Sequence, residues 1–346
     1  MKHQTTRYGE IPFYKIGTFG NTADAFISKK LFLEYKTKYS FPKKGDILIS
    51  ASGTIGRAVI YDGKPAYFQD SNIVWIDNDE TLVKNDFLFY AYSNVKWNTE
   101  HTTILRLYND NFRNTLIPLP PLNEQSAIAN ILKDLDRYLC ALDALILKKE
   151  GVKKALSFEL LSQRKRLKGF NQAWQRVRLG DIANYLTSNL SAEQITQQGK
   201  IKVYDVNNFI GYTDTTFISD KPYISIVKDG SVGRVRILPP KTNILSTMGA
   251  LIANHRTTTE FLFYLLSNFD FKNFTSGSII PHIYFKDYKE KTIFLPPLNE
   301  QIAIANILSA LDNEIISLKN KKRQFENIKK ALNHDLMSAK IRVLKK

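Results

Sequence analysis

Two long segments of the chain carry apolar residues at a spacing close to seven. Such a repeat is typical of a helix that buries one stripe of side chains against a second helix in a coiled coil. The first segment should run as a helix from Asn123 to near Arg166, a length of roughly 65 Å at about 1.5 Å per residue. The expected seam residues are Ile128, Ile131, Leu135, Leu142, Leu145, Val152 and Leu156, and then Ile304, Ile307, Leu311, Leu318, Phe325, Ile328 and Leu332.

Both segments begin with the same seven residues, LPPLNEQ. The two prolines end the preceding extended stretch, the asparagine can cap amide groups of the first turn, and the glutamate suits the positive end of a helix. The leucine before the asparagine should pack and fix the angle at which the helix leaves its domain. We expect the motif to start each helix. The two copies are Leu119, Pro120, Pro121, Leu122, Asn123, Glu124 and Gln125, and Leu295, Pro296, Pro297, Leu298, Asn299, Glu300 and Gln301.

The sequence outside these segments consists of short β-branched or aromatic runs punctuated by Gly and Asn, as in residues 44–53 and 203–211. Such runs predict strands and turns, with one short helix around Phe87 and another around Phe261. The order is globule, helix, globule, helix, so the second helix should return antiparallel beside the first, with a globule at each end. The predicted fold class is α+β, with two pseudo-symmetric globular domains joined by two long antiparallel helices. The expected domain ranges are 1–118, 119–168, 169–294 and 295–346.

An internal repeat extends well beyond the seven residues. At an offset of 176 positions, residues 127–132 match residues 303–308, and residues 153–156 match residues 329–332. Upstream, GTIGR at 53–57 resembles GSVGR at 230–234. A tandem duplication explains this pattern best.

The positive charge is concentrated at two places. The net charge is +16. Residues 148–178 hold ten Lys or Arg against two acids, and residues 319–346 hold ten against two, so each stretch contributes +8 and the rest of the chain is neutral. Cations at helix C-termini also complement the helix dipole, but two equal stretches favour contact with a polyanion.

Little in the sequence points to catalysis. It contains neither a [DN]-P-P-[YFW] loop nor a GxxxxGK[ST] loop, and its five histidines form no metal-binding motif, so we expect no catalytic residue, metal or bound cofactor. Asp46 and Asp62 fit turns better than a nuclease site.

Cys140, the only cysteine, lies in a leucine-rich segment and should serve packing. No run is long enough to cross a bilayer and the first ten residues are polar, which predicts a cytoplasmic protein without membrane contact.

Two pairs of matching segments are candidate contacts to nucleic acid. The glycines of 53–57 and 230–234 would allow a tight turn that projects Arg57 or Arg234, and arginine suits forked contacts to guanine or phosphate. The same sequences also fit a structural hairpin with a solvated arginine. Segments 102–108 and 278–284 end just before the helices and are either DNA-contacting loops or plain strands. The candidates there are Arg106, Tyr108, His282 and Tyr284, with Lys165 and Lys340 added from the basic stretches.

These residues resemble the specificity (S) subunits of type I restriction-modification enzymes. Members of that family carry two target-recognition domains, each followed by a long helix that opens with a PPL-x-EQ junction, as at residues 120–125 and 296–301. A second mark, an aromatic residue followed by an LG[DE]I strand, resembles Trp174–Ile182. Aligning Gly9 on Gly199 sets an offset of 190 and puts the counterpart of Trp174 before Met1. We therefore expect the first domain to lack its opening strand.

The resemblance implies a non-catalytic subunit that binds double-stranded DNA at a bipartite, asymmetric target. It would assemble with two modification (methyltransferase) subunits and with restriction subunits, which would hold the S-adenosylmethionine, ATP and magnesium, and the LPPLNEQ motifs would contact these partners. Two alternatives stay open. One is a coiled-coil adaptor that binds other proteins, with the basic stretches serving only solubility, and the other is a truncated recombination cassette of a specificity gene.

Overall fold

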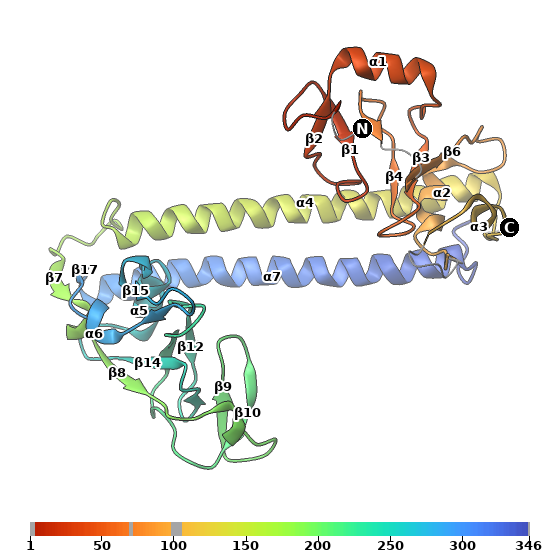
Figure 1. Cartoon of the computed structure of the whole chain (residues 1–346). Helices are drawn as coiled ribbons and strands as arrows, with labels where there is room; N and C mark the ends of the chain where they lie inside the picture. The colour runs from red at the N-terminus through yellow and green to blue at the C-terminus, as the bar shows by residue number, and fades with distance from the viewer. Residues whose placement is uncertain (1–3, 69–71, 98–105, 345–346) are drawn as a thin grey trace. The chain divides into compact units, whose positions relative to one another are not determined.

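A computed structural model describes residues 4–68, 72–97 and 106–344. The chain divides into two compact units (Figure 1). Unit 1 contains Met1–Asp143 and Asn320–Lys346, and unit 2 contains Ala144–Lys319.

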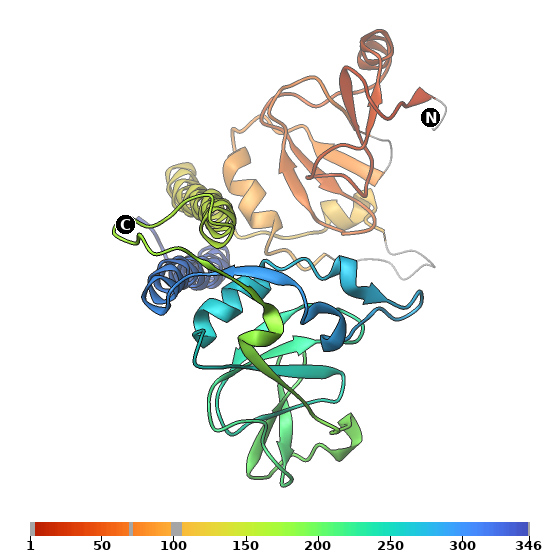
Figure 2. The same cartoon turned by 90° about the vertical axis from the view of Figure 1, so that its left-hand side faces the viewer.

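Two helices of 40 residues each, α4 (Leu122–Leu161) and α7 (Leu298–Met337), are shared by the units. Within each unit, half of α4 lies beside half of α7 in antiparallel orientation (Figures 1 and 2). Lys322 pairs with Asp143 in unit 1, and Lys149 pairs with Glu314 in unit 2. The first helix ends at Leu161, before the expected Arg166.

Residues in the left-handed conformation follow the ends of both helices. Gln163 has a φ of 61° after α4, and Ala339 has a φ of 56° after α7. A left-handed residue redirects the chain and stops the helical hydrogen-bond ladder. The two positions differ by 176, so the repeat includes the way each helix ends.

Unit 1 contains two three-stranded sheets. The strand order is β2-β1-β5 in one sheet and β4-β3-β6 in the other. Its strands are β1 (Ile11–Tyr14), β2 (Ala25–Ile27), β3 (Ile47–Ser50), β4 (Ala58–Ile60), β5 (Tyr67–Phe68) and β6 (Ile73–Ile76), and its shorter helices are α1 (Lys29–Lys38), α2 (Asn85–Tyr92) and α3 (Asn109–Arg113).

Unit 2 repeats these sheets as β10-β9-β13 and β12-β11-β14, and it extends the second sheet by β8. The shared strands are β9 (Ile201–Tyr204), β10 (Phe209–Thr213), β11 (Tyr223–Val227), β12 (Val235–Leu238), β13 (Asn243–Ile244) and β14 (Met248–Ala253). The others are β7 (Gln175–Arg178), β8 (Ala183–Thr187), β15 (Thr275–Ser276), β16 (His282–Ile283) and β17 (Thr292–Leu295). Its shorter helices are α5 (Thr259–Ser267), α6 (Phe285–Tyr288) and the 3-10 turns η3 (Leu179–Asp181), η4 (Ala192–Gln194) and η5 (Lys272–Phe274).

The sheets confirm the tandem duplication. β1 and β9 each pair with one antiparallel and one parallel neighbour. β3 and β11 are the central strands of matching antiparallel sheets. The predicted α+β class and the short helices around Phe87 and Phe261 are confirmed as well.

The heptad seam was only partly predicted. Ile128, Leu142 and Ile304 are buried, but Ile131, Leu145, Val152 and Ile328 are exposed. Leu132 is buried in place of Ile131, and Ile146 is buried in place of Leu145. The helices therefore bury side chains outside the predicted seam, because they pack against the globules as well as against each other. Leu132 belongs to a cluster with Phe87 and Tyr90 of α2.

Two smaller packing predictions are wrong. The Cys140 side chain is exposed rather than packed. Leu122 and Leu298 are the first residues of their helices and are 38% and 45% exposed, so they do not pack as residues before a cap.

Candidate nucleic-acid interface

The two glycine-rich turns have the same geometry. In unit 1, Ser50 N donates to Arg57 O and Gly56 N donates to Ser50 O, both at 2.9 Å. In unit 2, Val227 N donates to Arg234 O and Gly233 N to Val227 O, again at 2.9 Å. The tight turn expected from the glycine spacing is therefore present in both copies.

The second glycine of each turn is required by its surroundings. Gly56 has a φ of 81° and Gly233 a φ of 80°, a region that favours glycine. A Cβ atom on Gly56 would lie 2.2 Å from the Trp97 ring, and one on Gly233 would lie 2.6 Å from the Phe271 ring. An aromatic side chain thus sits against the backbone of each turn.

The structure brings each turn next to the second predicted segment. Leu107 N donates to Ala51 O at 2.8 Å, and Ser52 and Arg106 form a β-bridge. In unit 2, Ile283 N donates to Lys228 O at 2.9 Å, and Asp229 and His282 form the matching bridge. We name residues 52–57 with 106–108 edge 1, and residues 229–234 with 282–284 edge 2. Residues 102–105 of the predicted segment lie outside the described part of the chain.

The candidate side chains on the edges are accessible but not equivalent. Arg57 and Arg234 are both exposed, and the Arg57 guanidinium donates to Phe19 O at 3.0 Å. The Arg106 guanidinium lies over the Tyr108 ring, 5.8 Å from its centre. His282 Nδ1 lies 2.6 Å from Asp229 Oδ1, and its ring stacks on Tyr284. Each edge therefore presents an aromatic ring beside a different polar group.

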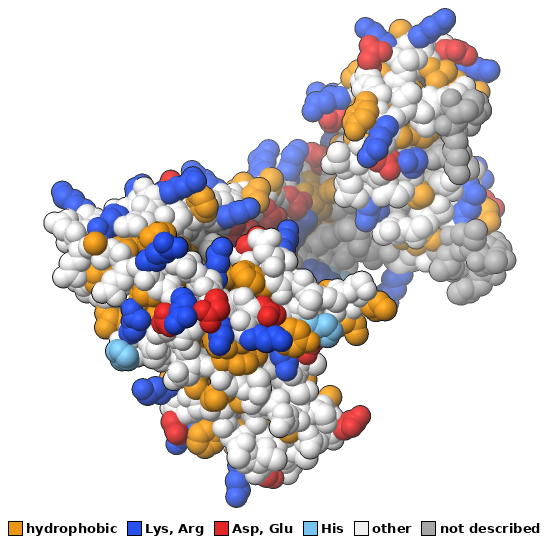
Figure 3. Space-filling view, turned by 60° about the vertical axis from the view of Figure 1, so that its left-hand side comes forward, with side chains coloured by type: hydrophobic (Ala, Val, Ile, Leu, Met, Phe, Trp, Pro, Cys, Tyr) orange, Lys and Arg blue, Asp and Glu red, His pale blue; other side chains and the backbone are white. Residues whose placement is uncertain are grey.

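The basic stretches are less cationic in the structure than in the sequence. Several of their side chains are ion-paired, including Lys165 with Glu159 and Lys340 with Asp335. The face of unit 2 in Figure 3 shows Lys and Arg interspersed with Asp and Glu rather than one continuous basic surface. The basic residues that make no ion pair within the described part of the chain include Lys148, Lys154, Lys168 and Lys330.

The LPPLNEQ motif joins each helix start to its own globule. Gln301 Nε2 donates to Arg256 O and Pro296 O, and its Oε1 accepts from Thr258 N. Gln125 makes the same bonds to Leu82 O, Pro120 O and Lys84 N. Asn123 Oδ1 and Asn299 Oδ1 each accept the next amide at 2.9 Å, so they satisfy a first-turn amide from inside the helix instead of from the cap position.

The motif glutamates hold the segment that follows the other long helix. Glu300 accepts from the Arg166 guanidinium at 2.7 Å, and Glu124 accepts from Arg342 at 2.6 Å. The Arg342 guanidinium lowers the pKa of the Glu124 carboxyl below its ordinary value. Both carboxylates are almost fully buried. The glutamates thus have a structural role that reasoning from helix dipoles did not predict.

A further repeated network was missed in the sequence. Asp136 of α4 accepts from the Tyr90 hydroxyl at 2.8 Å and pairs with Lys329 of α7. In unit 2, Asp312 of α7 accepts from Tyr264 at 2.9 Å and pairs with Lys153 of α4. The match of residues 153–156 with residues 329–332 was the available signal in the sequence, but it does not show that Lys153 pairs with Asp312 or that Lys329 pairs with Asp136.

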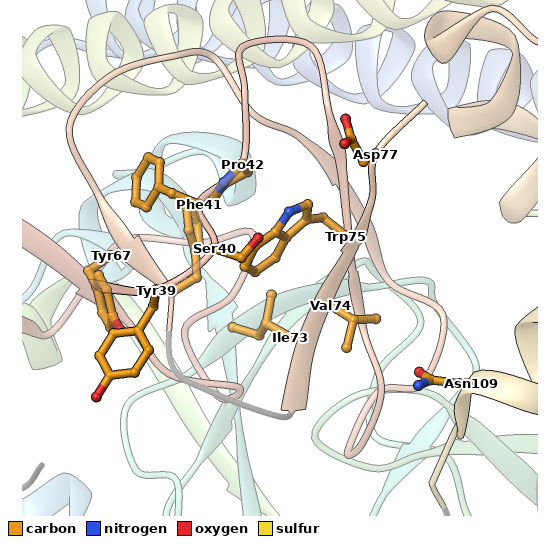
Figure 4. A pocket seen from close by; sticks show the side chains of 11 residues that line it. Tyr39, Ser40, Phe41, Pro42, Tyr67, Ile73, Val74, Trp75, Asp77 and Asn109 are labelled. Atoms are coloured by element: carbon orange, nitrogen blue, oxygen red, sulfur yellow. The ribbon is translucent and has the colours of Figure 1, made fainter. Parts of the chain in front are cut away.

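Unit 1 also contains an aromatic cavity of about 690 Å³ beside β6. Phe41, Tyr67 and Trp75 contribute to its lining, as Figure 4 shows. The described residues include no cluster of acidic, His and Cys side chains that could hold a metal ion. Among the helices that the structure describes, none is long and apolar enough to cross a membrane.

A family model, the type I restriction modification DNA specificity domain, matches residues 1–149 and 171–327. The chain belongs to this family. As a type I specificity subunit it is a non-catalytic component concerned with DNA recognition, as the sequence resemblance implied. The two matched ranges also agree with the duplication seen in the sheets.

Individual relatives agree with this assignment. A Haemophilus influenzae chain named as a type I restriction enzyme specificity subunit is 65% identical over 133 residues, which cover 38% of this chain and 34% of that one. The type I restriction enzyme MjaVIII specificity subunit of Methanocaldococcus jannaschii is 25% identical over 92% of this chain and 84% of its own. The fold is similar to that of the S subunit from M. genitalium, with a TM-score of 0.62, 20% identity, and coverage of 97% of this chain and 91% of that one.

Proposed function

We propose that this specificity subunit reads a bipartite, asymmetric DNA target, one half with edge 1 and the other half with edge 2. The observation that supports this is the pairing of each glycine turn with a second polar-aromatic segment at equivalent places in both units. Two exposed, homologous edges with different side chains suit the recognition of two different half-sites.

The chemistry of the two edges accounts for the asymmetry. Arg106 offers a planar cation that fits the O6 and N7 acceptors of guanine, and the stacked Tyr108 restricts its position. His282 is held by Asp229, whose carboxylate can also accept from the amino group of cytosine. Arg57 lies on edge 1 and Arg234 lies on edge 2. Both suit phosphate contacts, which position a protein on DNA without specifying bases.

We also propose that the subunit scaffolds its enzyme. Two modification subunits, which would carry S-adenosylmethionine, and restriction subunits, which would use ATP and magnesium, would bind around the helices. Leu122 and Leu298 are partly exposed apolar residues at equivalent helix starts. They are the motif residues best suited to contact a modification subunit, because Glu and Gln of the motif are buried within their own units.

The direct test is to map methylated adenines in cells that carry the subunit with its partner methyltransferase. Arg106→Ala should relax one half of the methylated sequence, and His282→Ala should relax only the other half. Each lost base contact should reduce discrimination by about 1–3 kcal/mol. Lys30→Ala, an exposed change on α1, is the matched control. If both edge variants methylate the original sequence unchanged, the edges do not read bases.

A further inference from the structure

The β15–β16 hairpin of unit 2 ends in an exposed apolar tip. β15 pairs with β16 in antiparallel orientation, and residues 277–281 connect the two strands. Within this loop, the side chain of Ile279 is 92% exposed and that of Ile280 is 54% exposed. Turns are usually built from Gly, Pro, Asn, Asp and Ser, so folding alone does not require isoleucine at these positions. Two adjacent exposed isoleucines therefore point to binding.

The conformation of the loop is restricted at both of its ends. Gly277 has a φ of 89°, and a Cβ atom there would lie 2.3 Å from Ile280 O, so this position requires glycine. Pro281 locks its own φ and favours an extended conformation of the preceding residue, Ile280. Pro281 O also accepts from Gly230 N at 2.9 Å. The tip is thus attached to the glycine turn of edge 2, and little conformational entropy is lost when it binds.

The tip is a direct continuation of edge 2. His282, whose ring nitrogen lies beside the Asp229 carboxylate, is the third residue after Ile279 in the chain. Three residues span at most about 10 Å of extended chain, which corresponds to roughly three base pairs at about 3.4 Å each. A duplex that is contacted by His282 therefore lies within reach of the Ile279 side chain.

Polar and cationic side chains flank the tip along the chain. On the hairpin itself, the hydroxyl-bearing residues Thr275, Ser276 and Ser278 are exposed. Lys272 precedes the hairpin and Lys286 follows it, and both are exposed and make no ion pair within the part of the chain that the structure describes. Two exposed acids, Asp270 and Asp287, are near them in the sequence, and Asp270 accepts from Lys272 N at 3.0 Å. Hydroxyl and ammonium groups are donors that contact DNA phosphates, so the flanks of the tip suit a DNA backbone.

The small size of the apolar tip favours DNA over a protein partner. A stable protein interface buries about 800 Å² on each partner around an apolar core. Two isoleucine side chains on a narrow hairpin supply only a small part of such an area. One isoleucine is enough, however, to fill the space between two separated base pairs.

We propose that Ile279 inserts between two adjacent base pairs of the half-site that edge 2 reads, with Ile280 packed against the sugar beside it. Proteins that deform DNA insert Ile, Leu, Phe, Met or Pro between base pairs, which unstacks and kinks the duplex. This inference rests on the proposed function of edge 2, and it adds a contact that recognises deformability instead of base edges. Pyrimidine–purine steps unstack most easily. The inserted step is therefore a TA, CA or TG step within about three base pairs of the pair that His282 contacts.

The test measures base stacking in the complex of the subunit with its partner methyltransferase. The DNA carries the methylated sequence, with 2-aminopurine in place of one adenine or pyrrolocytosine in place of one cytosine. A set of such duplexes covers every base pair except those of the methylated adenines. The fluorescence of both analogues rises when they unstack. We expect binding to raise it roughly three-fold or more at one step of the half-site that His282→Ala relaxes.

Variants of the tip show whether the isoleucine causes the unstacking. Ile279→Ser should abolish the rise at that step, and Ile279→Leu, which keeps the apolar volume, should retain it. Leu82→Ser, at a 66% exposed aliphatic residue of unit 1 outside both edges, is the matched control and should leave the rise unchanged. In methylation mapping, Ile279→Ser should relax the preference for the pyrimidine–purine step while the bases read by His282 stay the same.

A nick in one strand at the inserted step gives a second measurement. The nick leaves every base in place and lowers the cost of kinking, so the unaltered complex should bind the nicked duplex about ten-fold more tightly than the intact one. The Ile279→Ser complex should bind both duplexes equally, because it does not kink the DNA.

The outcomes separate this inference from the proposed function. If His282→Ala relaxes a half-site but no step there shows the rise, or if the rise survives Ile279→Ser, the insertion is wrong and the reading of bases stands. If His282→Ala relaxes nothing, edge 2 does not read bases, whereas a step whose rise depends on Ile279 would still support the insertion. Loss of assembly with the methyltransferase in Ile279→Ser would show that the tip contacts protein and would overturn the proposal.

Discussion

At the scale of single residues, the Glu124 carboxylate holds the segment that follows α7. The attachment of this segment should therefore depend on whether the carboxyl is ionised. Arg342 lowers the pKa of this carboxyl below its ordinary value of 4.5. A group with a depressed folded pKa contributes stability above its unfolded pKa, and the contribution is lost as pH falls through the folded value. Hydrogen exchange at Val343 should therefore accelerate as pH drops below 4.5, after correction for intrinsic rates. Glu124→Gln should remove this acid dependence. A wild-type segment that stays protected well below that pH would contradict the assignment.

The Tyr90–Asp136–Lys329 network makes a second residue-scale prediction. Asp136→Ala leaves a tyrosine hydroxyl and a lysine without their acceptor, and should lower the free energy of unfolding by about 1–2 kcal/mol. Asp136→Asn retains an acceptor oxygen and should cost less. Asp312→Ala is the matched change in unit 2, and the double variant should show additive losses in urea denaturation because the two networks share no residue. Strong non-additivity would mean that the networks are coupled.

The residue scale is also where sequence reasoning was weakest. It indicated that Glu124 and Gln125 serve the helix start, but not that Gln125 bonds to residues more than 40 positions away. Such partners depend on which loop folds back to the helix, and no local pattern encodes that. Arg57 and Arg234 were identified together because the glycine spacing that makes the turn is itself local.

At the scale of elements, α4 and α7 each run unbroken through both units. We expect their length to set the gap between the two half-sites. Inserting about four residues after Leu142 and after Leu318 adds one turn, roughly 6 Å. At about 3.4 Å per base pair, the unspecified gap should lengthen by one or two pairs while the outer bases stay the same. Sequencing of methylated DNA measures this, and an active enzyme with an unaltered gap would exclude the helices as the ruler.

The elements themselves were largely predictable. Both long helices, their common start and the short helices around Phe87 and Phe261 followed from periodicity and repetition. The strict heptad did not hold, because Leu132 packs on α2 and Ile146 replaces Leu145 in the core. A helix that contacts a globule as well as a partner helix needs a wider apolar stripe than a coiled-coil seam.

At the scale of the whole molecule, the net charge of +16 overstates the cations available to DNA. Lys153 and Lys329 are held by acids, whereas the neighbouring Lys154 and Lys330 make no ion pair within the described residues. Duplex binding should weaken with salt, and Lys154→Gln or Lys330→Gln should each reduce the slope of log affinity against log salt by up to about 0.9. Lys30→Gln is the control in a fluorescence titration. A flat salt response of the unaltered chain would remove the basic stretches from the interface.

The division into units has a consequence for synthesis on the ribosome. Unit 2 is one continuous stretch, Ala144–Lys319, but unit 1 needs Asn320–Lys346 to join residues made long before. Phe87 and Tyr90 share their cluster with Leu336 and Met337, which emerge about 250 residues later, a delay of roughly ten to fifty seconds at about 5–20 residues per second. During that interval Ile128 and Leu132 of α4 can already pack on α2, but the part of the cluster that Leu336 and Met337 complete stays open. We therefore expect the first half of the chain to complete its core only after the C-terminal segment has been made.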